Sequence, residues 1–341
     1  MASLPKFDFA TKNQGPPPRG RLSAVPCFDI EAAVARIAAG GIVILAEGCS
    51  ADAAISLIAA ADDIAEATVN MMARDAHGLI CLAVTAEQAD RIGLEPMVAS
   101  PRNTRCVGFA RSIEATTGVT TGISAADRAR TMVVAADPDA SPQDLVSPGH
   151  VFPIIAHARG LVGRLGATEA ALALIGLAGC RSASLCRILR ADGEAATLAD
   201  LPGLAWASAL PPVTVAMLLE AQCAVERLVE REGEPRSVGQ ASDLRMIAYR
   251  SVDGGHRHIA LVRGSAAERR PATVQICRRA PDGQDIEAES ALAAAISHAI
   301  GAPSDNTLLL IDAGDANDPT GHSIVVKAIT RQILDDIADH G

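Results

Sequence analysis

Aromatic residues are scarce in this chain of 341 residues, where Phe, Trp and Tyr together make up 2%. Proteins that stack on single-stranded nucleic acid need exposed rings, and proteins that bind the phosphate backbone need a positive surface. Here 40 acidic side chains outnumber 30 basic ones, which gives a formal net charge of -10. The composition therefore argues against a nucleic-acid-binding protein.

Long apolar runs and paired cysteines are also missing. The longest apolar run, near residues 171–178, is too short to cross a bilayer, and the first twenty residues lack the apolar core of a secretion signal. The eight cysteines are scattered and form no CxxC pair, which argues against a zinc ribbon. We therefore expect a cytoplasmic protein with reduced thiols, without bound zinc and not attached to a membrane.

Hydrophobic residues make up 49% of the chain, enough for a large core. Helix-like and strand-like patterns alternate over residues 25–227, which predicts an α/β (α+β layered) domain. We expect helices at 31–39, 51–73, 85–92, 124–135 and 168–177, strands at 42–45, 79–84, 107–113 and 185–190, and a loop at 137–149. Thr85, Ser124 and Thr168 are the expected N-caps of three of these helices.

The charged stretch 226–240, which contains Gly and Pro, predicts a domain boundary. A smaller α/β domain is expected over residues 228–341, and the proline-containing residues 1–24 are expected to form a disordered tail. The second domain is expected to contain strands at 244–249, 258–262, 273–277 and 308–311, helices at 286–300 and 324–337, and a polar loop at 312–321.

Four motifs in the first domain go beyond composition. They are HGLICLAV at 77–84, GVTTGISAADRART at 118–131, SPGHVFP at 147–153 and RLGATEAA at 164–171. In this order and spacing they resemble 3,4-dihydroxy-2-butanone 4-phosphate synthase, and the resemblance covers roughly residues 28–225. Members of that family convert ribulose 5-phosphate into formate and the four-carbon precursor of riboflavin. The resemblance implies a phosphorylated sugar as ligand.

The resemblance also implies roles for individual residues. His150 matches the catalytic histidine and Cys81 the strand cysteine of the family. Arg164 and Thr168 match the phosphate-contacting positions, and a phosphate at a helix start gains backbone N–H donors and the helix dipole. The turn on the substrate side corresponds to Thr120, Thr121 and Gly122.

The metal-binding part of the family pattern is altered in this chain. Family members use a divalent cation, and the resemblance implies Mg²⁺ held by a carboxylate and a histidine. The metal-binding Glu falls on Asp52, or on Glu47 if the register slips, and the metal-binding His falls on Ala167. The essential Glu falls on Arg187, whose guanidinium cannot act as a base at neutral pH. A substrate-binding Arg, a further Glu and a substrate-contacting Asp fall on Ala51, Ala54 and Ser56.

The second domain resembles a shortened GTP cyclohydrolase II, an enzyme that many bacteria fuse to the synthase. The resemblance rests on residues 258–264 and 271–276. The first zinc-binding Cys of that family falls on Ala280, and no cysteine follows Cys277. A zinc-bound hydroxide therefore cannot form there, and we expect no cyclohydrolase activity.

Purely structural roles remain open for most of these residues. His150 could bond only to loop backbone, Cys81 could be a buried apolar side chain, and Asp52 could be a solvated helix residue. Arg164 and Thr168 could be a surface charge and a helix cap, and Arg187 could pair with a local acid such as Asp192. Residues 255–258 and 312–318 contain possible metal ligands, but they are expected to form a polar hairpin turn and a solvated loop.

Three hypotheses about function follow. In the first, the chain is a diverged paralogue that keeps a sugar-phosphate pocket and has lost the metal site. In the second, it is an active lyase whose Mg²⁺ is held by rearranged ligands such as Asp52, Glu47 or Glu169. In the third, it performs an unrelated reaction on a phosphorylated substrate. The first two imply a homodimer, because the family builds its active sites between subunits.

Overall fold

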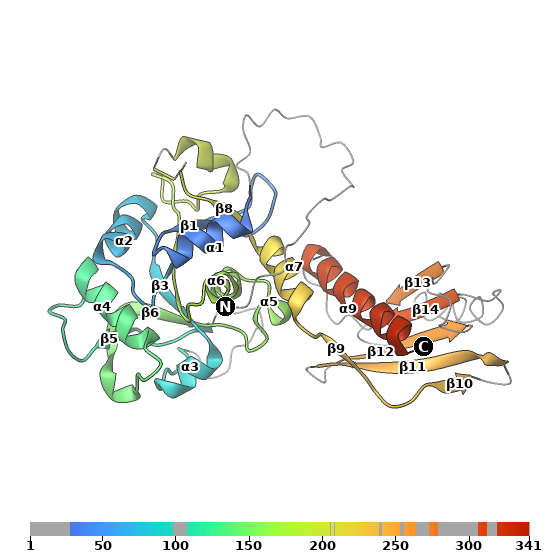
Figure 1. Cartoon of the computed structure of the whole chain (residues 1–341). Coiled ribbons are helices and arrows are strands. Elements are labelled where there is room, and N and C mark those ends of the chain that lie inside the picture. Colours follow the sequence, from blue (N-terminus) through green and yellow to red (C-terminus); the bar gives the residue numbers. More distant parts are fainter. Residues whose placement is uncertain are drawn as a thin grey trace.

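The fold is taken from a computed structural model that describes residues 28–97, 108–204, 206–207, 209–238, 241–252, 256–263, 273–278, 306–311 and 319–340. Figure 1 shows two lobes, each built around its own β-sheet. The first lobe carries all four motifs of the synthase resemblance. None of the helices in the described ranges combines the length and apolar character that a membrane span requires.

The sheet of the first lobe is mixed, with β3–β6 and β1–β8 parallel and the other neighbours antiparallel. Strand β5 (Ile113–Ala115) pairs with β6 outside the main path. The main path runs in the order β4 (Gly108–Phe109), β6 (Leu145–Ile155), β3 (Ile80–Val84), β7 (Ala183–Arg187), β2 (Ile55–Ala60), β1 (Val43–Ala46) and β8 (Pro212–Thr214).

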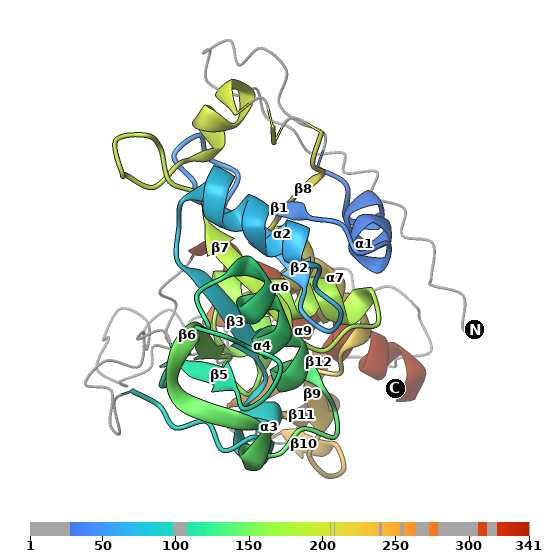
Figure 2. The same ribbon diagram turned by 90° about the vertical axis from the view of Figure 1, so that its left-hand side faces the viewer.

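Helices cover both faces of this sheet, because successive strand residues point to opposite sides. Val43 and Leu45 pack in one core with α1 (Ile30–Ala38), α6 (Ala167–Leu177) and α7 (Val215–Val225). Ile44 and Ala46 pack in the other core, with α2 (Glu66–Met71), its π-helical continuation η1 (Met72–Ala76), α3 (Ala86–Arg91) and α4 (Ala125–Ala136). Figure 2 shows α2 and α4 on the near side of the sheet. The layered α/β fold is therefore confirmed.

Short helical turns connect several of these elements. They are α5 (Gly160–Gly163), η2 (Pro142–Asp144) and η3 (Leu198–Gly203). Thr85 and Ser124 cap α3 and α4 as expected, since each side chain accepts a backbone N–H three residues on.

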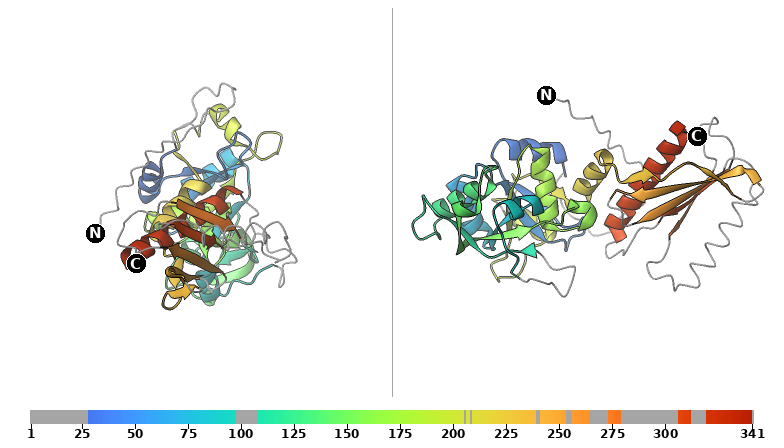
Figure 3. Two further views of the ribbon diagram at one scale, coloured as in Figure 1. Left: turned by 90° about the vertical axis from the view of Figure 1, so that its right-hand side faces the viewer. Right: turned by 90° about the horizontal axis from the view of Figure 1, so that it is seen from below.

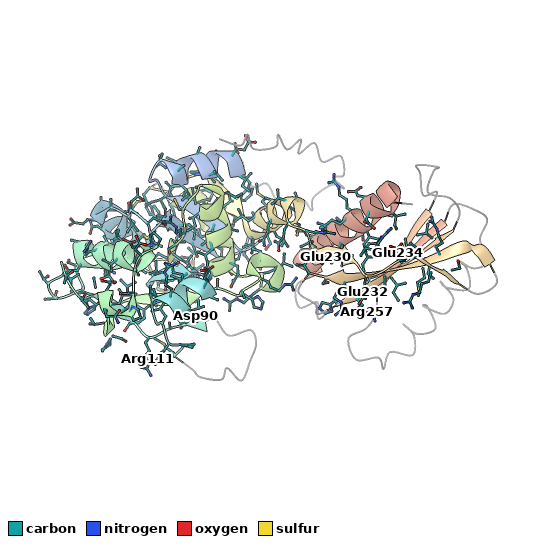
Figure 4. All side chains as sticks on the ribbon, turned by 60° about the horizontal axis from the view of Figure 1, so that its bottom comes forward. Asp90, Arg111, Glu230, Glu232, Glu234 and Arg257 are labelled. Carbon is teal, nitrogen blue, oxygen red and sulfur yellow. The ribbon has the colours of Figure 1, made fainter. Side chains whose placement is uncertain are left out.

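The second lobe contains the strands β10 (Arg236–Val238), β11 (Ala241–Ser251), β12 (Arg257–Arg263), β14 (Asn306–Ile311) and β13 (Thr273–Arg278) in that order, with β9 (Val229–Arg231) beside β11. Figure 3 shows α9 (Pro319–His340) lying along this sheet. Ile329 and Ile333 of α9 share a core with Ile247 of β11. At the surface, the Glu232 carboxylate accepts a hydrogen bond of 2.6 Å from Arg250 Nη2 and one of 2.8 Å from Arg257 Nε. Figure 4 labels Glu232 and Arg257.

The expected helix over 51–73 is wrong in its first half. Residues 55–60 form β2, a central strand whose six residues are all buried. A strand buried on both faces reads as one continuous apolar run, which periodicity alone cannot distinguish from a buried helix. Asp52 consequently lies in a turn before β2 and not in a helix.

Three other expectations also need correction. The loop expected over 137–149 ends early, because β6 begins at Leu145. The register of β6 with β5 shifts, so that residues 147–150 lie between Val146 and Val151, which pair with the neighbouring residues Glu114 and Ile113 of β5. The N-cap of α6 is Gly166, and Thr168 lies inside the helix. Of the hairpin turn expected at 255–258, Arg257 and His258 belong to β12, in agreement with the strand expected at 258–262. The expected tail 1–24, the helix 286–300 and most of the loop 312–321 lie outside the described residues.

Candidate functional site

The residues singled out from the sequence lie at two opposite edges of the first sheet. We call one the Arg187 edge: it holds the end of β7, opposite Ser56 at the start of β2. We call the other the Arg164 edge: it holds the end of β6, where Ile155 pairs with Val84. Along β3, the position level with Arg187 and the position level with Ile155 are five residues apart. At the usual rise per strand residue this is about 16 Å. Within one chain, Arg164 and Arg187 are therefore far apart.

At the Arg164 edge, a buried carboxylate fixes the arginine that the resemblance assigns to phosphate. Glu169 has a fully buried side chain, and its Oε1 accepts from Arg164 Nε at 2.8 Å and from the backbone N–H of His157 at 2.8 Å. Arg164 also reaches the carbonyl of Ile155 at 3.4 Å and remains 21% exposed. Part of its guanidinium is therefore held in place and part faces solvent.

Thr168 directly precedes Glu169 and is the second residue of α6. Its side chain is only 4% exposed, so it packs into the fold and does not cap the helix. The helix start nevertheless presents unpaired backbone N–H groups and the positive end of the helix dipole. Arg164 and the start of α6 thus place positive charge at this edge, next to the buried carboxylate of Glu169.

A second cluster surrounds His150. Its Nδ1 lies 3.1 Å from Glu114 Oε2, and the ring is 43% exposed. The carboxylate accepts from Nδ1–H, which leaves Nε2 able to take up a proton. Glu114 also packs against Gly122, where a Cβ would approach Glu114 Oε1 to 1.5 Å and where φ is +81°. Only glycine fits there, so the cluster joins His150 to the turn on the substrate side.

That turn is held by Asp127 of α4. Its Oδ2 accepts from the Thr120 hydroxyl at 2.8 Å and from the Gly122 N–H at 3.0 Å. These bonds, that of the Thr120 hydroxyl foremost, lower the pKa of Asp127 below its usual 3.8. Thr120 and Thr121 are exposed. Sequence reasoning missed both Asp127 and Glu114, although Asp127 lies inside a quoted motif and Glu114 just precedes it.

At the Arg187 edge, the altered residues of the family pattern contact one another. Arg187 Nη2 donates a hydrogen bond to Glu47, and the side chains of the two residues are 35% and 38% exposed. The expected pairing of Arg187 with Asp192 is therefore wrong; Asp192 lies instead by Arg190, 3.4 Å away. Glu47 follows β1 and Arg187 ends β7, so the charge reversal at position 187 brings a cation onto one of the two acids considered for Mg²⁺.

These residues do not fit a divalent cation. Ala167 has no ligating atom, Arg187 carries a positive charge, and Glu47 is already paired with it. Asp52 is exposed, and the hydroxyl of Ser50 lowers its pKa, so its carboxylate is ionised but isolated. No group of three or more possible ligands from His, Cys, Asp and Glu occurs among the residues that the structure describes.

Cys81 lies in the core between the sheet and α6, and its side chain is buried. Burial, with a smaller contribution from Cys186, raises the pKa of Cys81 to about 12. Since the thiolate is the reactive form, Cys81 stays a protonated thiol at neutral pH. The structural alternative for Cys81 fits this environment better than a catalytic one.

A groove of about 590 Å³ lies beside Glu169, between α6 and α7. Its walls include Leu172, Leu177, Leu218 and Val225. The polar residues that line it are Thr85, Glu87, His157, Glu169 and Gln222. Neither Arg164 nor Thr168 lines it. An apolar groove with a carboxylate at one end does not suit a sugar phosphate.

Taken together, the fold and these clusters define a layered α/β domain in which an arginine is paired with a buried carboxylate and a histidine lies beside a second carboxylate. The profile of the 3,4-dihydroxy-2-butanone 4-phosphate synthase family matches residues 31–221, more than half of the chain. The chain belongs to this family. The family is a riboflavin-biosynthesis family.

Individual relatives agree with this assignment. The riboflavin biosynthesis protein RibBA of Synechocystis is 40% identical over 245 residues, which span 71% of this chain and 44% of that protein. The 3,4-dihydroxy-2-butanone 4-phosphate synthase of Pseudomonas syringae is 40% identical over 221 residues, 64% of this chain and 60% of that protein. The matches thus span about half of these relatives.

Solved structures show the same similarity. RibBX of A. baumannii, a two-domain 3,4-dihydroxy-2-butanone 4-phosphate synthase, is 31% identical, covers 90% of each chain and gives a TM-score of 0.74. A synthase in complex with two magnesium ions is also 31% identical; the match covers 58% of this chain and 98% of that one, with a TM-score of 0.52. The likeness to RibBX extends over both lobes.

Proposed function

We propose that this chain is a diverged paralogue of 3,4-dihydroxy-2-butanone 4-phosphate synthase. It binds a phosphorylated sugar such as ribulose 5-phosphate but lacks the magnesium-dependent turnover of the family. The observation that carries the proposal is the ion pair between Arg187 and Glu47, at the edge where the resemblance implies a catalytic carboxylate. A guanidinium neither ligates a cation nor accepts a proton at neutral pH.

The binding half of the proposal rests on the Arg164 edge. Glu169 holds Arg164 in one orientation, so less conformational entropy is lost when a phosphate binds. The solvent-exposed part of the Arg164 guanidinium and the N–H groups at the start of α6 suit phosphate oxygens. At the other edge, His150 and Glu114 are arranged to exchange a proton with a ligand hydroxyl.

The experiment measures both halves on the full chain. Isothermal titration with ribulose 5-phosphate tests binding, and formate release in the presence of Mg²⁺ tests turnover. We expect binding without formate release, and loss of binding in Arg164→Ala but not in the control Arg181→Ala, an exposed arginine near the end of α6. Sustained formate release would reject the loss of turnover, and absence of binding would reject the retained pocket.

An active lyase is the second candidate function. Two observations favour it: a relative that is 40% identical is named as a synthase, and the Asp52 carboxylate is exposed and ionised. In this candidate, Asp52, Glu47 or Glu169 would supply oxygen ligands to Mg²⁺, the cofactor implied by the family. Formate release that disappears in Asp52→Asn would establish this alternative.

We also propose a homodimer. The Arg164 edge and the Arg187 edge lie about 16 Å apart in one chain, a separation too large for one small sugar phosphate to contact both. A second subunit can bring its own Arg164 to the first subunit's His150. Sedimentation equilibrium should give twice the 35.0 kDa mass of one chain. A monomer at micromolar concentration would contradict the proposal.

For the second lobe, we propose a domain over residues 228–341 that derives from GTP cyclohydrolase II and has lost its zinc chemistry. The start of β9 at Val229 agrees with a boundary at this point, and the whole chain is expected in the cytoplasm. We expect no GTP hydrolysis and no zinc in the purified protein. Stoichiometric zinc measured by mass spectrometry would refute this part.

A further inference from the structure

Four side chains on the Arg187 edge share one face of the sheet. Leu45 lies opposite Ser56, and Ser56 lies opposite Arg187. The antiparallel register of β3 and β7, continued by one residue, places Leu79 beside Arg187. Side chains two residues further into each strand belong to the core under α1 and α6; they are Val43, Ile58, Leu185 and Cys81. Because side chains alternate, the row at the edge faces the same way.

Leu45 and Ser56 of this row are buried, whereas Leu79 and Arg187 at its other end reach solvent from a fixed backbone. Leu79 is 51% exposed, and Arg187 and Glu47 are each more than one-third exposed. Gly78 packs so closely on β7 that a Cβ there would lie 2.0 Å from the Arg187 carbonyl oxygen. Arg187 therefore starts from a rigid strand end and extends over an accessible surface with an apolar neighbour.

The polar side chains of the row prefer a different kind of ligand from the side chains that the resemblance implies at these positions. Two carboxylates of the family pattern fall on Ser56 and Arg187, so two negative charges are replaced by a hydroxyl and a guanidinium. Carboxylates accept hydrogen bonds from sugar hydroxyls and ligate cations, whereas a guanidinium only donates. The edge has therefore changed from one that suits hydroxyls and a metal to one that suits anionic oxygen atoms.

Arg187 also retains donors for such a ligand. Its hydrogen bond to Glu47 uses Nη2, and Nη1, which is buried, has no hydrogen-bond partner among the residues described. A planar guanidinium can bind Glu47 and a second carboxylate at once, because it carries five N–H donors in a fixed fork. The Glu47 contact orients the guanidinium, and the exposed Leu79 provides a surface for a short carbon chain.

We propose that the Arg187 edge binds the carboxylate of a small sugar acid, with Arg187 taking the electrostatic place of the family's metal ion. The inference rests on the proposed function and the proposed homodimer, since the phosphate end of the same ligand would bind Arg164 of a second subunit. The preferred ligand is thus a phosphorylated sugar acid, and its binding needs no divalent cation.

Titration calorimetry of the full chain in EDTA tests this proposal, with D-erythronate 4-phosphate and ribulose 5-phosphate as probes. We expect the sugar acid to bind about tenfold more tightly, because hydrogen bonds between charged groups contribute about that much. Arg187→Gln should remove the preference and leave the affinity for ribulose 5-phosphate within about twofold. The control Arg190→Gln, an exposed arginine three residues on, should keep the preference.

Equal binding of the two probes, a preference that survives Arg187→Gln, or a requirement for Mg²⁺ would each overturn the proposal. Unphosphorylated D-erythronate tests the carboxylate site independently of the phosphate site. If erythronate binds through Arg187 while Arg164→Ala has no effect on any probe, the carboxylate site stands and the phosphate site fails. If ribulose 5-phosphate binds through Arg164 and Arg187→Gln changes nothing, the carboxylate site alone fails.

Discussion

At the scale of single residues, positions 167 and 187 decide what chemistry the first lobe can support. In the proposed homodimer, which brings the Arg164 edge of one subunit to the Arg187 edge of the other, we expect the double variant Ala167→His/Arg187→Glu to bind Mg²⁺ weakly, with an affinity of about millimolar. The variant supplies a ligand atom and releases Glu47 from its ion pair. Calorimetric titration with MgCl₂ measures the gain. The single variants should gain less, and equal Mg²⁺ binding by the unmodified chain would contradict the expectation.

Glu169 is a second residue whose effect follows from its contacts. Glu169→Gln leaves the Arg164 guanidinium beside a neutral amide in a buried position. Breaking a buried pair in this way costs about 3 kcal/mol; the partial exposure of Arg164 lowers the expected loss in free energy of unfolding to about 2 kcal/mol. Urea denaturation measures the loss. Glu87→Gln, at an exposed position on α3, serves as the control and should change stability by less than about 0.5 kcal/mol.

At the scale of elements, the first turn of α4 and the preceding loop depend on one carboxylate. Bonds to Thr120 and Gly122 lower the pKa of Asp127 in the folded state, so its ionised form stabilises the fold at any pH above 3.8. This contribution is lost as the pH falls through the lowered pKa. Asp127→Asn should therefore be less stable than the unmodified chain at neutral pH, and the difference should shrink in acid.

Urea denaturation at neutral pH and at a pH below 3.8 measures both differences. Asp90→Asn, an exposed position on α3 (Figure 4), is the matched control and should show little change at either pH. A difference between Asp127→Asn and the unmodified chain that stays constant with pH would show that the side chain acts through its shape and not through its charge.

The elements also show where the sequence was informative. Amphipathic surface helices such as α1 and α4 were predicted closely, because the caps and the period of their apolar residues are local signals. The central strand β2 was missed because its partners, β1 and β7, are distant in sequence. The start of β6 was missed because Pro148 and Gly149 are typical of a loop, whereas β5 tolerates them through a shift in register.

At the scale of the whole molecule, the second lobe is held together by contacts between its sheet and α9. The hydroxyl of Tyr249, a residue that is 1% exposed, donates to Asp336 at 2.7 Å, and Arg231 approaches the same carboxylate at 3.0 Å. Tyr249→Phe removes this bond, which is worth about 1 kcal/mol, and keeps the ring in place. Hydrogen exchange in α9 should then be about fivefold faster, whereas unchanged exchange would contradict a stabilising role.

The sequence by itself determined the family, the layered α/β class and the altered metal positions, because motif order and residue type are properties of the chain. The resemblance also led to a predicted phosphate-binding role for Arg164 and a predicted catalytic role for His150. Only the tertiary structure decided which of these residues meet, since contacts across strands depend on register. The pairing of Arg187 with Glu47, the holding of Arg164 by Glu169 and the separation of the two edges all arise from how distant segments pair in one sheet.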